Sequence, residues 1–142
     1  MIYLPDTNVF SAYLSGRSKP LTDRMTSAFA AGELRLSVMV LAELEFGAEK
    51  ARQKLGETKF VRRVEQLRKQ LDLEPIGSSF PQCYATVRAG LEIEGKKIGD
   101  RDTIIAAHAL SLGATMVTAN VGEFSRIPGL NVENWEMESD TA

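Results

Sequence analysis

The sequence of 142 residues is poor in the side chains that build many common functional sites. It has one cysteine, Cys83, and one histidine, His108. A single cysteine excludes an internal disulfide and any zinc site with several thiolate ligands, as is usual in a reducing compartment. We therefore expect Cys83 to be a small buried hydrophobic residue, and His108 to be packed structurally.

The sequence also lacks a long hydrophobic run and an excess of positive charge. No apolar segment approaches the roughly 20 residues that span a bilayer, which excludes membrane insertion. The N-terminal "MIYL" is interrupted by Pro5 and Asp6 and has no basic region, so we expect no secretory signal and a cytoplasmic location. A net charge of −2 excludes a global basic field, so any nucleic-acid contact must use local cations.

What is present is the composition of an ordinary globular domain, with 44% hydrophobic and 25% charged residues. The length suits one hydrophobic core, and there are no repeats or linkers rich in proline, glycine or serine. We therefore expect one domain over residues 1–136 and a flexible tail over 137–142.

Strands are expected to alternate with helices along the chain. The expected strands are 2–5, 34–39, 73–76, 114–118 and 131–135, and the expected helices are 8–15, 20–31, 40–53, 58–71, 79–94 and 101–112. This alternation predicts an α/β fold with a mostly parallel central sheet of about five strands and helices on both faces.

Acidic and amide side chains follow the predicted strands or begin the helices beside them. These residues are Asp6, Glu43, Asp100, Asp102, Asn120 and Glu123. In open α/β sheets ligands bind outside the carboxyl ends of the strands, so we expect these side chains to converge there. Carboxylates gathered at one edge repel one another unless a cation neutralises them. Oxygen ligands suit Mg²⁺ or Mn²⁺ rather than zinc, which indicates phosphodiester hydrolysis.

Each acid also has a plainer explanation. Asp102 and Glu43 can be first-turn residues that interact with a helix dipole, which is worth only about 0.3–1 kcal/mol. Asp6 is harder to explain in that way, because burial at a strand–helix junction without a partner costs several kcal/mol. Glu45 is expected to be solvated, since it leaves the helix on nearly the opposite face from Glu43. His108 does not share the helix face of Asp102.

Four motifs in order resemble the PIN-domain ribonucleases of the VapC toxin type. The motifs are "LPDTNVF" at the start, "LSVMVLAELEFGAEK" at 36–50, "IGDRDTIIAAHAL" at 98–110 and "VTANVGEF" at 117–124. The resemblance covers almost the whole chain and implies a PIN-like three-layer fold. It also implies a metal-dependent endoribonuclease toxin, which cuts RNA to leave a 5′-phosphate and a 3′-hydroxyl and is partnered by a VapB-type antitoxin.

The resemblance assigns roles to residues of this chain. The catalytic acids would be Asp6, Glu43, Asp102 and Glu123, with Asp6 and Asp102 holding Mg²⁺ or Mn²⁺; the supporting polar residues would be Thr7, Asn8, Thr118 and Asn120. Glu43 and Glu123 would orient the attacking water or a second ion. A homodimer is expected, with an apolar groove near helices 8–31 and 40–53 for the antitoxin tail. The first RNA expected as substrate is transfer RNA.

Three positions depart from the family pattern. Val40 stands where the family often has the Ser or Thr of a capping box, which leaves the start of that helix open. Asp100 stands where an uncharged residue is usual, so "GDRD" offers two aspartates. If Asp100 is the N-cap, then Asp102 keeps its carboxylate free. Pro5 lacks an N–H group, which would shorten the first strand or leave one ladder position unpaired.

Two other functions were weighed. A phosphatase with Asp6 as nucleophile, of the haloacid-dehalogenase type, needs a second aspartate two positions on, where this chain has Asn8. A catalytically inactive PIN-like module that only binds RNA or a partner would be expected to lack some of the acids. RNA binding would use local cations, namely Arg17, Lys19, Lys96, Lys97 and Arg101. The basic segment from Arg52 to Lys69 is expected to be a solvated helix face.

Overall fold

The computed structural model describes residues 1–137, and within this range it contains five short strands and seven helices. The strands are β1 (Tyr3–Pro5), β2 (Leu36–Ser37), β3 (Leu73–Glu74), β4 (Thr115–Val117) and β5 (Val132–Glu133). The helices are α1 (Thr7–Ser15), α2 (Lys19–Ala30), α3 (Val38–Leu55), α4 (Lys59–Gln70), α5 (Phe80–Ile93), α6 (Asp100–Leu112) and α7 (Val121–Phe124). The predicted tail, except residue 137, lies outside the described residues.

The strands are all parallel, but they do not form one continuous five-stranded sheet. β1, β4 and β5 form a three-stranded sheet in the order β1-β4-β5, and β2 pairs with β3 separately. One isolated bridge between Tyr3 and Leu34 joins the two parts. The prediction of a single sheet of about five strands was therefore wrong. The reason is that Pro5, which stands opposite Leu36 of β2 in the register of this bridge, has no N–H to donate across to it.

Pro5 keeps the pairing of β1 with β4 but weakens its pairing with β2. The N–H of Asp6 donates to the Val117 carbonyl at 2.9 Å, and the N–H of Tyr3 donates to Glu33 on the other side at 2.8 Å. Because N–H groups alternate sides along a strand, Pro5 would point its missing donor toward β2. In the parallel register set by the Tyr3–Leu34 bridge, Pro5 stands opposite Leu36 of β2, so the missing N–H removes a ladder bond between β1 and β2.

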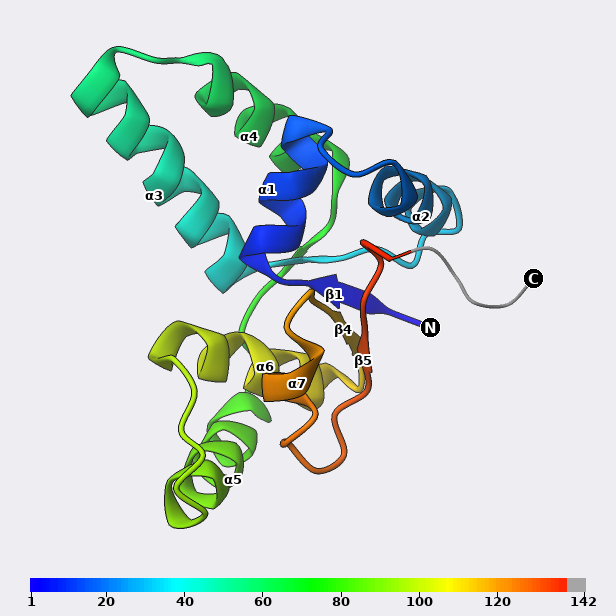
Figure 1. The fold of residues 1–142 in the computed structure, drawn as a ribbon, viewed down its shortest axis with the longest axis vertical. Helices are drawn as coiled ribbons and strands as arrows, with labels where there is room; N and C mark the ends of the chain where they lie inside the picture. Colours follow the sequence, from blue (N-terminus) through cyan, green and yellow to red (C-terminus); the bar gives the residue numbers. More distant parts are fainter. Residues whose placement is uncertain (138–142) are drawn as a thin grey trace.

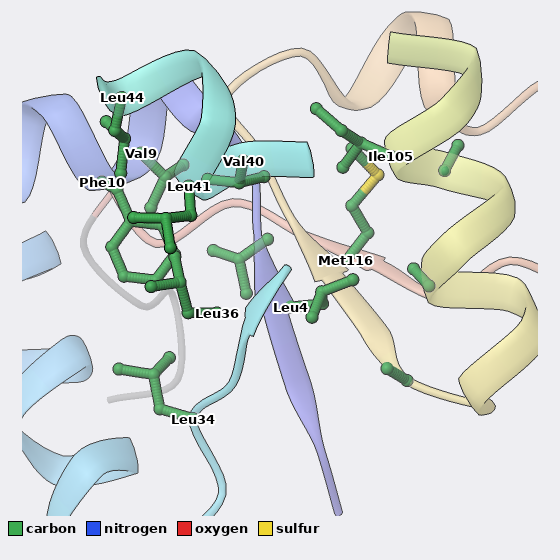
Figure 2. Close-up of a cluster of buried hydrophobic side chains, with 14 of the residues drawn as sticks. Leu4, Val9, Phe10, Leu34, Leu36, Val40, Leu41, Leu44, Ile105 and Met116 are labelled. Carbon is green, nitrogen blue, oxygen red and sulfur yellow. The ribbon is translucent and has the colours of Figure 1, made fainter. Parts of the chain in front are cut away.

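The helices enclose the strands. Figure 1 shows α1 to α4 on one side of the strands and α5 to α7 on the other, which places the sheet between two helical layers. The buried core joins these layers. In Figure 2, Leu4 and Met116 from the sheet lie between Val40 and Leu41 of α3 and Ile105 of α6, and all five side chains are buried. The α/β class with helices on both faces is confirmed.

Two helix assignments differ from the sequence-based expectations. Helix α3 begins at Val38 rather than at residue 40, because the Ser37 hydroxyl caps it by accepting a hydrogen bond from the Met39 N–H at 3.2 Å. Glu43 therefore lies in the second turn of α3 and not in the first. Helix α7 was not predicted, because its four residues "VGEF" are too few to show a helical period.

Candidate functional site

Asp6 is fixed at the junction of β1 and α1, beyond the carboxyl end of the strand. It is the N-cap of α1, and its carboxylate accepts a hydrogen bond from the Val9 N–H at 2.8 Å. Only 6% of the residue is exposed. An N-cap uses only part of the hydrogen-bonding capacity of a carboxylate, so the remaining lone pairs are available to a ligand.

Burial raises the pKa of Asp6 above its ordinary value. Hydrogen bonds from the Thr118 hydroxyl and the Val9 N–H oppose this shift, whereas the carboxylates of Asp102 and Glu136 add to it. Asp6 therefore lies among negative groups, in a position where a bound cation would favour its charged form.

Asp102 belongs to the same acidic cluster and reaches it from α6. Its pKa is raised first by partial burial and then by the carboxylates of Glu123 and Glu43, while Arg101 partly offsets the increase. Electrostatic effects therefore link Asp102 to Glu43 and Glu123, and Asp6 to Asp102. We define the acid cluster as Asp6, Glu43, Asp102 and Glu123.

The role suggested for Asp100 as an N-cap was wrong. Gly99 holds the cap position of α6, and its carbonyl accepts the Thr103 N–H at 2.9 Å. Glycine is one of the residues favoured at an N-cap, and because it has no side chain this helix forms no side-chain cap hydrogen bond. Asp100 is the first helical residue, is exposed, and lines a small hollow with Tyr84 and Arg88 of α5. Asp100 and Asp102 therefore have different surroundings.

Glu43 is held from two sides. The Thr7 hydroxyl donates to one carboxylate oxygen at 2.8 Å, and an Arg101 guanidinium nitrogen lies 3.6 Å from the other. The Glu43 side chain is 19% exposed, whereas that of Arg101 is 68% exposed. Thr7 is thus a specific orienting contact, while Arg101 is a solvated cation at the mouth of the acid cluster.

Helix α7, which follows β4, supplies the last acid, Glu123. The Asn120 side-chain amide donates to the Glu123 carboxylate, and the Asn120 N–H donates to the Thr118 hydroxyl at 3.0 Å. Thr118 is fully buried. Asn8, the fourth of the predicted supporting residues, is exposed at the second position of α1. Three of these four residues therefore contact the cluster or each other.

The donor set fits one kind of cation site and not another. Within residues 1–137, no three side chains among His, Cys, Asp and Glu lie close enough together to share one ion. The structure thus does not support a closed site made only of protein ligands. Mg²⁺ keeps several waters and is commonly held by one or two carboxylates, a donor set that Asp6 and Asp102 could supply.

Two residues near the acid cluster were not identified as site residues from the sequence. Glu136 lies close enough to Asp6 to raise its pKa, and its carboxylate is 3.9 Å from Arg17. Arg17 had been considered only as one of several local cations. The sequence signal that could have drawn attention to this segment is Trp135, the only tryptophan. In the structure Trp135 is buried and donates a hydrogen bond to Glu133, which fixes the chain just before Glu136.

The remaining predictions about single residues have mixed outcomes. Glu45 is exposed and pairs with Arg68 at 3.3 Å, as expected for a solvated side chain. His108 is fully buried and hydrogen-bonded at both ring nitrogens, which confirms a packed role. Cys83 is only half-buried, so the expectation of a buried residue was wrong. No helix within residues 1–137 is long and apolar enough to cross a membrane.

Comparisons with known proteins agree over nearly the whole chain. A family model described as "PIN domain" matches residues 3–130. The chain is 31% identical to "Ribonuclease VapC2" of Rickettsia felis, over 96% of this chain and 99% of that protein. It is 29% identical to "tRNA(fMet)-specific endonuclease VapC" of Shigella flexneri, over 94% and 97% of the two chains.

Solved structures give the same result. The VapBC2 structure from Rickettsia felis, bound to a DNA fragment from its promoter, superposes with a TM-score of 0.86 at 30% identity and covers 95% of this chain and 99% of that chain. VapBC-1 from nontypeable Haemophilus influenzae superposes with a TM-score of 0.82 at 30% identity and covers 96% and 100%.

Proposed function

Because this chain belongs to the PIN-domain family, we propose that it is an endoribonuclease that acts as the toxin of a toxin–antitoxin pair. The observation that carries the proposal is the acid cluster, with Asp6 buried and the others partly exposed, in a PIN-domain fold matched over nearly full length to VapC ribonucleases. A protein that only bound RNA would have no need for carboxylates, which repel the RNA phosphates. The inactive-module alternative is therefore disfavoured.

The proposed cofactor is a divalent cation, Mg²⁺ or Mn²⁺, held by Asp6 and Asp102. When bound, such an ion supplies Lewis-acid stabilisation of charge on the scissile phosphate. The ion also removes the conflict between two carboxylates whose pKa values are raised by burial and by their neighbours.

The other residues of the cluster orient and activate. Glu43, fixed by Thr7, accepts a proton from the attacking water. Glu123 is oriented by the Asn120 amide and aligns the same water or a second ion. Thr118 donates to Asp6 and keeps its carboxylate oriented. Asn8 is exposed at the entrance and is available to an RNA phosphate or sugar.

The substrate proposed first is a transfer RNA, since the Shigella flexneri relative is named for cleavage of tRNA(fMet). In this protein the exposed guanidinium of Arg101 lies beside Glu43 and is well placed to contact the RNA backbone. Lys96 and Lys97 precede α6 in the same exposed segment and would add local positive charge.

The proposed partners are a VapB-type antitoxin and a second copy of this chain, in the cytoplasm. The similar Rickettsia and Haemophilus structures are VapBC complexes. Here a groove of about 370 Å³ lies between α1 and α4, lined by Tyr13, Leu14 and Leu67 among others. We propose this groove, whose lining also includes Arg63, Gln66 and Gln70, as the seat of an antitoxin segment.

The test is cleavage of purified transfer RNA by the purified protein with Mg²⁺, with Mn²⁺, and with chelator. We expect cleavage with either ion and none in chelator. The matched control is Glu45→Gln, which removes a carboxylate from the same helix as Glu43 but from its solvated face. Cleavage that persists in chelator, in protein free of contaminating nuclease, would refute the metal-dependent mechanism.

A further inference from the structure

A second buried polar group lies beneath the acid cluster and takes no part in the chemistry described above. It consists of Ser37, the N-cap of α3, and His108 of α6, and both residues are fully buried. The Ser37 hydroxyl is 2.9 Å from His108 Nδ1. On its other side, His108 Nε2 is 3.1 Å from the Pro75 carbonyl, just after β3.

The hydrogen-bond partners fix the proton positions. The Pro75 carbonyl can only accept, so Nε2 of His108 carries a proton and donates it. Burial lowers the pKa of His108, and the Pro75 carbonyl and the Glu74 carboxylate only partly oppose this effect. The ring is therefore neutral at pH 7, and Nδ1 accepts a hydrogen bond from the Ser37 hydroxyl. The same hydroxyl oxygen accepts the Met39 N–H.

This hydrogen bond connects the two helices that carry catalytic acids. Ser37 stands six residues before Glu43, at the start of α3. His108 stands six residues after Asp102, in α6. Six residues of helix correspond to about 9 Å of rise, so the bond lies less than two turns from each acid. The two helices also pack directly against each other.

We propose that His108 is a positioning residue, whose hydrogen bond to Ser37 fixes α3 relative to α6 and so sets the place of Glu43 with respect to Asp102. This inference rests on the proposed function, since it assigns a task to a site that must first be shown to cleave RNA. It differs from a purely stabilising role, because a loss of the bond is expected to change the reaction rate in molecules that remain folded.

Two substitutions at position 108 separate the two hydrogen bonds. In His108→Asn the side-chain amide reaches about as far as Nδ1 and can keep the contact with Ser37 while losing Pro75. In His108→Gln the amide reaches about as far as Nε2 and can keep Pro75 while losing Ser37. Both variants replace the ring by an uncharged amide, so each is the control for the other. Ser37→Ala removes the same bond from the opposite side and also the N-cap of α3, so its rate is read together with its thermal stability.

We expect His108→Gln and Ser37→Ala to lower kcat by about 10–100-fold with little change in KM, because small misplacements of catalytic groups have effects of this size. His108→Asn should stay within about threefold of wild type, since the contact with Ser37 that orients α3 is retained. Folding of each variant is checked by circular dichroism and thermal unfolding. Equal losses in His108→Asn and His108→Gln would overturn the proposal, and so would wild-type kcat in both His108→Gln and Ser37→Ala.

A measurement without RNA tests the geometry independently. The chain has a single histidine, so the ¹⁵N chemical shifts of its ring are unambiguous in the wild-type protein. We expect a neutral ring with the proton on Nε2 at pH 7, and loss of the hydroxyl contact at Nδ1 in Ser37→Ala. A ring protonated on Nδ1 would contradict the inference.

Failure of this inference is distinguishable from failure of the proposed function. If the wild-type protein cleaves no RNA with Mg²⁺ or Mn²⁺, the proposed function is wrong. If the wild-type protein cleaves RNA and binds Mn²⁺ alone, while His108→Gln matches His108→Asn in kcat, the proposed function stands and the positioning role is wrong.

Discussion

Two groups of buried polar side chains in this protein differ in charge and in how fully the chain itself stabilises them. The Ser37–His108 pair is neutral, and each of its polar side-chain atoms has a hydrogen-bond partner within the chain. Asp6 and Asp102, by contrast, are acids whose pKa values are raised by burial and by neighbouring carboxylates. A polar group whose hydrogen bonds are all made within the chain fixes the geometry around it. Buried negative charge without a positive partner is costly, and a bound cation would stabilise it. The comparison separates the residues that hold the site from those that perform the chemistry.

The largest expected effect comes from Asp6→Asn. Asparagine can still cap α1, since its side-chain oxygen can accept the Val9 N–H, but it removes the charge that would hold a cation. We expect RNA cleavage to fall by at least about 1,000-fold, in line with the loss of major electrostatic stabilisation in other enzymes. The melting temperature in chelator should stay the same or rise, because a buried carboxylate among like charges has been neutralised. Cleavage rates and thermal unfolding measure both. A fully active Asp6→Asn protein would remove Asp6 from the mechanism.

Asp102→Asn should be nearly as severe, with Asp100→Asn as its neighbouring control. Asp102 is half-buried among Glu43 and Glu123, whereas Asp100 is exposed beside α5. We expect Asp102→Asn to lower cleavage by about 100-fold or more and to weaken Mn²⁺ binding. Asp100→Asn should change both by less than about threefold, because it alters only a solvated charge. The reverse result in folded proteins would reverse the assignment.

The grouping of the acids in this comparison could be predicted from the sequence. Asp6, Glu43, Asp102 and Glu123 could be grouped because parallel strands end at one edge, whatever their separation along the chain. Elements of 9 to 18 residues, such as α1 and α3, showed clear patterns. The position of an acid just after a strand can therefore be read from a short segment, and it predicts which distant acids lie near one another in the fold.

The parts that could not be predicted depend on contacts between distant segments. The sheet divides because Pro5 offers no N–H toward β2, and β2 ends at Ser37, which also caps α3 and is hydrogen-bonded to His108, 71 residues later. The proximity of Glu136 to Asp6 depends on the burial of Trp135 against the first strand, where the rings of Tyr3 and Trp135 lie 4.8 Å apart. Neither pattern is visible in a local window of sequence.

Thr7→Val should have an intermediate effect. It removes the hydroxyl that donates to Glu43 while keeping the shape of the side chain at the start of α1. We expect cleavage to fall about 2- to 12-fold, the equivalent of one hydrogen bond of about 0.5–1.5 kcal/mol. Thr7→Ser, which keeps the hydroxyl, should stay close to wild type. If Thr7→Ser lost as much activity as Thr7→Val, the hydrogen bond to Glu43 would not be the cause.

The smallest expected effect is on the pH dependence of stability without metal. The pKa values of Asp6 and Asp102 are raised in the folded protein, so between the unfolded and the folded pKa the folded state binds more protons than the unfolded state. The free energy of unfolding contributed by these two groups must then fall as the pH rises through this window, which starts near the ordinary Asp pKa of about 3.9. Glu49 acts in the opposite sense, because its hydrogen bond to Arg52 lowers its pKa to about 2, but it is fully exposed and its contribution is screened.

Thermal unfolding in chelator should be compared between the wild-type protein and the Asp6→Asn, Asp102→Asn double variant across the same pH range. The difference in melting temperature should grow in favour of the double variant as the pH rises, and adding Mn²⁺ should reverse it by stabilising only the wild-type protein. A difference that does not vary with pH would mean that the two carboxylates carry no excess electrostatic cost, and the contrast with the Ser37–His108 pair would then be lost.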